Sequence, residues 1–476
     1  MLPERRIKLT DAEEEIWKRV EEEMGGAQHC YLKVDASGTV IGGATSHHAQ
    51  LLKDERDLHK SLFERRDGLD ALFATSTVAQ GMNLPSDIVL IAGDSRWDDT
   101  KDKMQQLDAH ELLNAAGRAG RAGESGQGFV LIVPSRVIDL DDGANKIDHH
   151  WMSLQGIFAQ SDQCLVIDDP LTDLLDHIHN EINIGDNEDY LLARLPAGPD
   201  DDKDLPARAM LGRSFAAYRK RVEGKAKWIE SRIDAALVRR DELAPDEAVP
   251  VLGQVASSAG LPVDIVASLA KRIDKGKFDG DTKECVEALF RWLEKNPEYV
   301  LQVLRPNDVE GLFGKKYKEL PSSIEQARHA LPVIRILLEK WMAGEPLNQL
   351  ELAIGTHADK LGTCEVARHF AVRMASDMAF VAGLPARIIA ARKMEDDTVV
   401  MPTVLATLAG AVRRGCDSPD MLANAVNLGR EVSRVAARLA FEKIGKHISA
   451  GDPAEPFEAT LERIRTAQLV SMFDAL

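Results

Sequence analysis

Cysteine is scarce in this chain, and its scarcity excludes two kinds of stabilising centre. Only 5 of the 476 residues are cysteines, and they stand alone at positions 30, 164, 285, 364 and 416. An odd, dispersed set without a C-x-x-C pair provides neither a disulfide framework nor a zinc site. The cysteines therefore predict reduced thiols in a cytoplasmic protein.

Long hydrophobic runs are absent as well. The longest, VVMPTVLATLAGAV at 399–412, contains Pro402 and is shorter than the ~20 residues of a membrane-spanning helix. The opening stretch MLPERRIKLTDAEEE has no apolar core of the kind that signal peptides carry. We therefore expect no membrane partner.

Positive charge is in deficit over the chain as a whole. Asp and Glu number 77 against 59 Lys and Arg, which gives a formal net charge of -18 at pH 7. Such a balance argues against a protein that coats nucleic acid with its entire surface. It still allows a local basic groove, because physiological salt screens charges over roughly 8 Å.

The first 135 residues alternate short apolar runs with helical stretches. The pattern predicts buried parallel strands, apolar on both faces, at 70–75, 87–93 and 128–134. Between them, residues 53–66 carry Leu58, Leu62 and Phe63 at helical spacing. Strands alternating with helices are typical of a parallel α/β layer, so we expect an α/β domain here.

The sequence changes character after Pro134. A helix is predicted to begin at Asp169 and Pro170, and LPAGPDDDKDLP at 195–206 is a polar, proline-rich stretch typical of a linker. Beyond it the pattern is helical almost throughout. We therefore divide the chain into an α/β domain, a helical connector, a linker and an all-α region, at 1–135, 136–196, 197–205 and 206–476.

Small hydroxyl residues follow the first of the predicted strands. Thr75, Ser76 and Thr77 come directly after it, and Gly81 and Asn83 stand just before a proline. Hydroxyls and exposed N–H groups at the carboxyl end of a parallel strand suit a phosphate site. A capped helix start explains the same residues without any ligand.

Two arginines stand among glycines and alanines in HELLNAAGRAGRAG, residues 110–123. A guanidinium group is a planar fork that suits phosphate oxygens, and glycine lets the backbone approach a ligand closely. We expect Arg118 and Arg121 to lie at the carboxyl edge of the parallel sheet. The alternative is a glycine-rich turn whose arginines are solvated.

The two stretches together carry a resemblance to a known family. SHHAQLLKDERDLHKSLFERRDGLDALFATSTVAQGMNLP followed by ELLNAAGRAGRAGESGQGFVLI resembles the second RecA-like domain of superfamily 2 DExH-box helicases, superkiller-like branch. The resemblance covers about residues 40–135. Asn114 stands where the family has glutamine, and Gln50 stands where it has glycine after the histidine pair.

The resemblance implies a role for each matching position. It places Thr75 and Thr77 on the phosphates of a nucleic-acid strand and His47 and His48 on the strand-binding face. It makes Arg118 and Arg121 the pair that reaches the γ-phosphate of ATP, in the manner of an arginine finger. The same match assigns to the ATP cleft the residues Gly81, Asn83, Asn114 and Gly117. As a bare pair, the histidines are also explained by packing.

The phosphate loop G-x-x-x-x-G-K-[ST] and the DExH box are both absent from these 476 residues. The chain therefore looks like the C-terminal half of a helicase. ATP and Mg²⁺ would be bound mainly by an N-terminal half, on a separate polypeptide or lost from the reading frame. We expect the chain alone to hydrolyse no ATP.

A basic stretch opens the all-α region. Residues 206–240 hold ten Lys or Arg against three Asp or Glu, and apolar residues recur every seven positions at Phe215, Val222, Ile229 and Ala236. This spacing predicts one helix with a buried stripe. Its basic residues are candidates for contacts to a DNA or RNA backbone, namely Arg219, Lys220, Lys225, Lys227 and Arg232. A solvated face paired with acidic neighbours is the alternative.

Two functions from different classes remain open. The first is the motor half of an ATP-dependent nucleic-acid helicase or translocase. The second is a non-catalytic scaffold that keeps a RecA-like domain and binds nucleic acid or protein through its helices, alone or as an adaptor in a larger complex. Two exposed arginines flanked by glycines favour the first, because a scaffold has no physical need for them.

Overall fold

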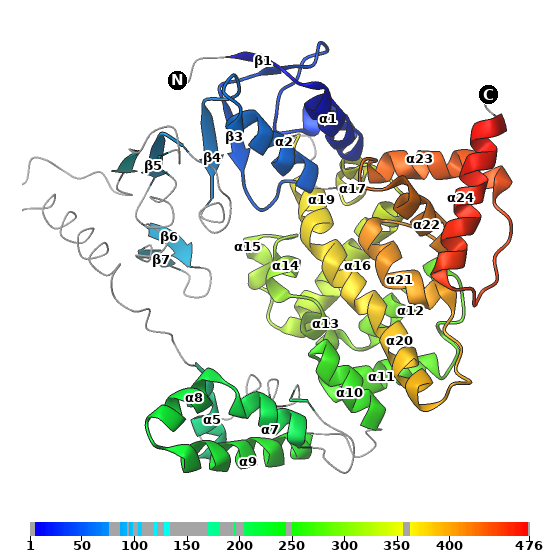
Figure 1. Cartoon of the computed structure of the whole chain (residues 1–476). Helices are drawn as coiled ribbons and strands as arrows, with labels where there is room; N and C mark the ends of the chain where they lie inside the picture. Colours follow the sequence, from blue (N-terminus) through cyan, green and yellow to red (C-terminus); the bar gives the residue numbers. More distant parts are fainter. Residues whose placement is uncertain are drawn as a thin grey trace, which may run out of the picture. The chain divides into compact units, whose positions relative to one another are not determined.

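The structure is a computed structural model, and Figure 1 shows the whole chain. It describes the residues 5–75, 86–92, 95–98, 103–106, 119–120, 128–133, 170–180, 192, 195–196, 204–243, 250–355 and 362–474. The chain divides into two compact units. The first comprises Met1–Lys18 and Tyr31–Ile167, and the second comprises Arg19–Cys30 and Asp168–Leu476.

The first unit contains paired strands and the helix α2. The antiparallel pairs are β1 (Arg6–Lys8) with β2 (Thr39–Ile41), and β6 (Ser95–Asp98) with β7 (Lys103–Gln106). The parallel pairs are β3 (Ala44–His47) with β4 (Ala71–Ala74), and β5 (Ile88–Ala92) with β8 (Phe129–Val133). Parallel pairs of this kind, followed by a long helical region, agree with the predicted α/β domain and all-α region.

Helix α2 (Lys53–Glu64) confirms the helix predicted at 53–66. Its first turn is closed by Glu55, whose carboxylate accepts the Leu52 N–H at 3.0 Å. Leu58 and Leu62 are buried on one face, as their spacing predicts. His59 ties the helix to β3, because its Nδ1 lies 2.7 Å from the carbonyl oxygen of Ser46.

The three predicted strands exist, but the prediction that they are buried on both faces is wrong. Phe73 of β4 is 66% exposed, Ile88 and Leu90 of β5 are each 58% exposed, and Phe129 of β8 is 67% exposed. The physical reason is the narrowness of the sheets. Among the described residues each ladder has only two strands, and two strands cannot cover one another's faces.

A group of four helices opens the second unit: α5 (Pro170–His179), α7 (Leu205–Gly212), α8 (Phe215–Val222) and α9 (Ala226–Leu243). One hydrophobic cluster unites them. Leu175 and Ile178 of α5 pack with Leu211 of α7 and with Ile233 and Leu237 of α9. Arg240 of α9 also forms an ion pair at 2.6 Å with Asp204, the residue that precedes α7 in the sequence.

The single helix predicted over 206–240 is instead three helices. Ser214 caps α8 by accepting the Ala217 N–H, and Gly224 adopts a φ of +75° that ends the helical path. Each break resets the phase of the seven-residue spacing. Ile229 is buried as predicted, but Phe215 and Val222 are exposed, so the prediction of a continuous buried stripe is wrong.

The rest of the second unit is a large helical assembly. Its helices are α10 (Pro250–Ala259), α11 (Val263–Ile273), α12 (Thr282–Lys295), α13 (Pro297–Val303), α14 (Pro306–Glu310), α15 (Lys315–Lys318), α16 (Ser323–Met342), α17 (Leu347–Ala353), α19 (Glu365–His369), α20 (Ala375–Glu395), α21 (Thr403–Arg414), α22 (Pro419–Leu428), α23 (Arg434–Ile444) and α24 (Phe457–Asp474). Trp292 and Trp341 are buried in it, and the Trp341 indole donates to the Val412 carbonyl at 2.9 Å.

The helices α19 and α20 form one long run through a π-helical turn at Phe370–Met374. By length and composition alone, the stretch Glu365–Met394 is long and apolar enough to span a bilayer. Here 61% of its most apolar window is buried inside the protein, and α20 packs against α10, α11 and α21. A buried core helix has the same composition.

A short N-terminal segment, Arg19–Cys30, belongs to the second unit, although more than a hundred residues separate it from Asp168. It contains the second half of α1 (Asp11–Met24) and a 3-10 turn at Ala27–His29. Glu23 pairs with Arg434 at 2.9 Å, and the carbonyl oxygen of His29 accepts from Arg368 at 3.0 Å. The segment is thus part of the framework of the helical assembly.

Candidate nucleic-acid and ATP site

The parallel ladder of β3 and β4 brings three predicted site residues to one edge. His47 lies opposite Ala74 in the register, and the N–H of Thr75 donates to the His47 carbonyl at 3.3 Å. His48 and Thr75 are therefore the first residues beyond the two adjacent carboxyl ends. The exposed Thr75 stands where a strand phosphate could approach.

His47, the last residue of β3, is a buried histidine. Its side chain is largely enclosed, and its Nδ1 atom has no hydrogen-bond partner in the described part of the chain. Burial lowers the pKa of His47, and the charges of Arg56 and His48 lower it further. The lowered pKa favours the neutral form of the ring.

His48 packs against an aromatic ring. It meets Tyr31 edge to face, with 5.0 Å between the ring centroids. No group of three His, Cys, Asp or Glu residues in the described ranges is arranged to hold a metal ion. The contact supports a packing role for this histidine at the strand edge.

The predicted ATP-cleft residues lie outside the described residues. These are Gly81, Asn83, Asn114 and Gly117, together with Arg118, Arg121 and the predicted strand contact Thr77. Their roles stay predictions.

The backbone between the two arginines is described at Ala119 and Gly120. The Gly120 N–H donates to the Ser86 carbonyl at 2.7 Å, and Ala119 forms a parallel bridge with Ser86. A Cβ on Gly128 would overlap both residues, so glycine is needed there. Ser86 and Gly128 precede β5 and β8, so this backbone lies at the amino ends of that pair. We expected the arginines at the carboxyl edge, and their side-chain positions stay untested.

The basic residues of α8 and α9 divide into two classes. Lys220 is largely buried and pairs with Glu223 at 3.5 Å, and its Nζ lies 5.1 Å from the centroid of Trp228. Arg232 lies over the same indole at 4.9 Å and donates to Asp176 at 2.9 Å. These two cations hold the local packing together, which is the alternative interpretation that the sequence left open.

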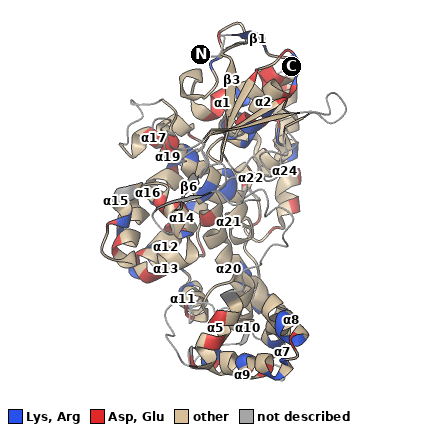
Figure 2. Ribbon diagram, turned by 90° about the vertical axis from the view of Figure 1, so that its left-hand side faces the viewer, with Lys and Arg blue, Asp and Glu red and all other residues tan. Residues whose placement is uncertain are grey.

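The remaining cations form an exposed surface with apolar and aromatic neighbours. Arg219, Lys225 and Lys227 are exposed, and Lys225 shares Glu223 with Lys220 at 3.2 Å. A hydrogen bond from Lys225 is the main cause that lowers the pKa of Glu223. Figure 2 shows the basic residues gathered along α8.

Sequence reasoning missed an aromatic residue on the same surface. Tyr218 is 60% exposed and Val222 is 71% exposed, one turn apart on α8 beside the exposed Phe215. Exposed rings among cations are the usual platform on which single-stranded bases stack. The spacing of three and four residues on a short capped helix was the signal that could have found them.

The comparisons with known proteins agree with the motifs. No protein-family model matches the chain. The chain is 31% identical over 141 residues to the DExH-box ATP-dependent RNA helicase DExH10 of Arabidopsis thaliana, which is 28% of this chain and 14% of that protein. It is 35% identical over 77 residues to the RQC trigger complex helicase SLH1 of Saccharomyces cerevisiae, and these residues are 16% of this chain and 4% of that protein.

A longer but weaker match reaches into the helical assembly. The chain is 23% identical over 332 residues to the activating signal cointegrator 1 complex subunit 3 of Rattus norvegicus, which is 65% of this chain and 14% of that protein. The chain thus spans from 4% to 14% of the length of these three relatives. These similarities support a relationship between this chain and the DExH-box helicases of superfamily 2.

Proposed function

We propose that this chain supplies the second RecA-like domain and the helical region of an ATP-dependent nucleic-acid helicase or translocase. The parallel pairing of β3 with β4 carries the proposal, since it sets His47, His48 and Thr75 at one strand edge. The helicase relatives support the same class of activity. The proposed domains are those expected from the sequence, with 1–135 as the RecA-like part.

In this proposal Arg118 and Arg121 act on a nucleotide held mainly by another domain. Neither a phosphate loop nor a DExH box occurs in the 476 residues, so in this proposal the first RecA-like domain, which carries both motifs, would bind ATP and Mg²⁺. Gly81, Asn83, Asn114 and Gly117 would line the near wall of the cleft. The arginines would stabilise the charge that develops on the transferred phosphoryl group.

The strand would be held at two places in this proposal. Thr75 and Thr77 would bind its phosphates at the edge of β4, beside His47 and His48. The exposed surface of α8 and α9 would hold another stretch through Arg219, Lys225 and Lys227, with Tyr218 as a stacking ring. Lys220 would act indirectly, by fixing Trp228.

The decisive experiment is an ATPase reconstitution. The chain is combined with a first RecA-like domain that carries both absent motifs, from the same genome, and single-stranded DNA and RNA are added in turn. Strand-stimulated hydrolysis is expected only with both parts, and Arg121→Ala should lower kcat by about 10³. Arg430→Ala, an exposed arginine of the helical assembly, serves as the control.

Two results would contradict the proposal. Hydrolysis by the chain alone would place the nucleotide site within it. Full activity of the Arg121→Ala variant would remove the arginine finger and leave the scaffold interpretation, for which the exposed Tyr218 and Val222 provide a docking surface.

A further inference from the structure

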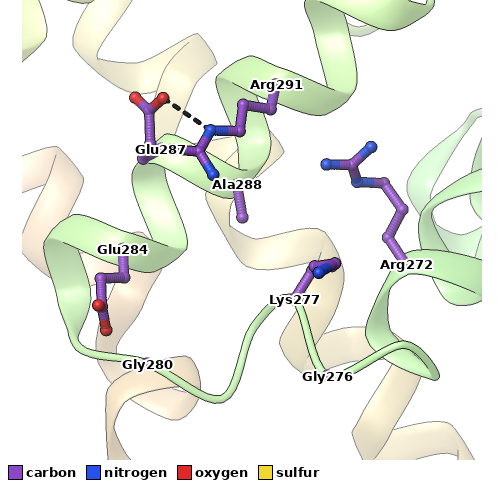
Figure 3. Close-up of a pocket in the computed structure, with 8 residues that line it drawn as sticks. All are labelled: Arg272, Gly276, Lys277, Gly280, Glu284, Glu287, Ala288 and Arg291. Atoms are coloured by element: carbon purple, nitrogen blue, oxygen red, sulfur yellow. Dashed lines mark hydrogen bonds and ion pairs between the residues drawn. The ribbon is translucent and has the colours of Figure 1, made fainter.

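We propose that a pocket between α11 and α12 is a phosphate-binding site, an assignment that does not depend on the function proposed above. The cavity has a volume of about 290 Å³. Its lining consists of Arg272, Gly276, Lys277, Gly280, Glu284, Glu287, Ala288 and Arg291. Figure 3 shows Arg272 and Arg291 on opposite walls, with Lys277 on the loop that joins them.

The wall formed by α11 is fixed by the way that helix ends. Gly276 adopts a φ of +63°, and its N–H donates to the Ile273 carbonyl at 2.9 Å. The next N–H, that of Lys277, donates to the Arg272 carbonyl at 3.2 Å. This pair of bonds is a Schellman ending, which reverses the direction of the chain after α11. As a result Lys277 and Arg272 line the same pocket.

The opposite wall is fixed by the start of α12. Asp281 accepts the Glu284 N–H at 2.8 Å, and Glu284 accepts the Asp281 N–H at 3.0 Å, which forms a capping box. A Cβ on Gly280 would overlap the Glu284 side chain. The side chain of Phe278 is buried and anchors the loop. The Cys285 thiol donates to the Phe278 carbonyl at 3.5 Å.

The two carboxylates of the pocket are already engaged. Glu284 is held by the backbone of its own capping box, and Figure 3 shows it turned away from the cations. Glu287 accepts from Arg291 Nε at 3.0 Å and also lies 3.8 Å from Arg335. Neither is left to neutralise the other two cations of the pocket.

Arg272 and Lys277 are the cations without a counter-charge. Neither side chain forms a hydrogen bond or ion pair within the described part of the chain. The Nε atom of Arg272 is buried and lacks an acceptor. A buried donor that has lost water and gained no partner is costly, and like charges gathered in one pocket repel. A bound anion would remove both costs.

The charged donors of the lining suit a phosphate group. Arginine and lysine donors match the several oxygens of a phosphate group, while the lining offers no aromatic ring on which a base could stack. A volume near the small end of ligand pockets fits a phosphate with a modest substituent. The phosphate could belong to a nucleic-acid strand or to a free phosphate ester.

The test titrates the full chain with inorganic phosphate and, separately, with pyrophosphate. Calorimetry in chloride buffer of constant ionic strength measures the binding. Saturable binding is expected, weakened at least about tenfold by Arg272→Gln and by Lys277→Gln. Lys283→Gln is the matched control, because it removes an exposed lysine of α12 outside the lining. Circular dichroism checks that each variant is folded.

Two further titrations distinguish the sources of the phosphate. One uses a fluorescent single-stranded oligonucleotide, and the other uses the same titration with pyrophosphate as competitor. If a strand supplies the phosphate, Arg272→Gln weakens oligonucleotide binding and pyrophosphate competes. If a free ester supplies it, Arg272→Gln changes only the titrations with small phosphates.

Either of these results supports the site. The proposal is overturned if folded wild-type protein binds none of the three probes. It is equally overturned if Lys283→Gln weakens binding as much as Arg272→Gln does, because the effect would then come from general charge rather than from the pocket.

Discussion

Arg368 shows, at the scale of a single residue, how a buried charge organises the helical assembly. Its side chain is fully buried, its Nε donates to the Thr363 carbonyl at 2.6 Å, and its Nη2 donates to the His29 carbonyl at 3.0 Å. We expect Arg368→Ala to lower the free energy of unfolding by about 3–5 kcal/mol, because buried acceptors lose their donor. Urea denaturation measures the change.

The control for this prediction is another arginine of the same assembly. Arg414 is exposed at the end of α21, so Arg414→Ala should change stability by no more than about 0.5 kcal/mol. Equal losses in the two variants would contradict a specific role for Arg368.

His47 leads to a prediction about pH. Its pKa in the folded chain lies below the ordinary value of 6.5, mainly because of burial. The unfolded chain then binds a proton that the folded chain does not, so stability falls as the pH drops below about 6.5. The urea midpoint of the wild type should decrease between pH 7.5 and pH 5.5 by more than that of His47→Gln. Identical pH profiles would rule out the effect.

The residues of the candidate site differ in how well the sequence could predict them. Thr75 follows Phe73 and other apolar residues of β4, and such a run is a strong strand signal. The strand β3 has the sequence ATSH, which contains no apolar run, and only pairing with β4 makes it a strand. The contact between His47 and Thr75 depends on that register, which no local pattern encodes.

At the scale of whole elements, α8 and α9 show where periodicity misleads. A seven-residue spacing predicted one helix, but Ser214 and Gly224 interrupt it. Both signals are visible in the sequence, since serine is a common N-cap and glycine a common helix ending. The pocket beside α11 was not predictable in this way, because its cations come together only through two helix ends.

The surface of α8 and α9 is expected to bind nucleic acid through its exposed lysines. Reversal of Lys225 and Lys227 to glutamate should weaken binding and reduce the slope of log affinity against log salt by about one per lost phosphate contact. Fluorescence anisotropy at several salt concentrations measures both. Lys220 is excluded from this variant, because it holds Trp228 in place.

A matched variant separates this effect from a change in net charge. Lys393→Glu with Lys443→Glu makes the same change on exposed lysines of α20 and α23. Its affinity and salt slope should stay near those of the wild type. If both double variants weaken binding alike, the α8 surface has no special role.

At the scale of the whole molecule, the N-terminal segment Arg19–Cys30 packs with the C-terminal helices to form the helical unit. Ser433 donates to Glu22 at 2.7 Å, and Asn348 donates to the Gly25 carbonyl at 3.2 Å. Val20 and Met24 of the same segment are fully buried. Neither charge nor periodicity in the sequence predicts these contacts, because the contacting residues are hundreds of positions apart.

The helical unit should therefore depend on the N-terminal segment. Removal of residues 1–30 eliminates, among other side chains, the buried Val20 and Met24 of this segment, worth about 3–6 kcal/mol together, and leaves Arg434 and Arg368 without their partners in the segment. We expect faster amide hydrogen exchange in α16 and α23, measured by mass spectrometry on the peptides 323–342 and 434–444. Removal of residues 1–9 is the control, since it keeps Arg19–Cys30. Unchanged exchange in the longer deletion would mean that the helical unit closes without this segment.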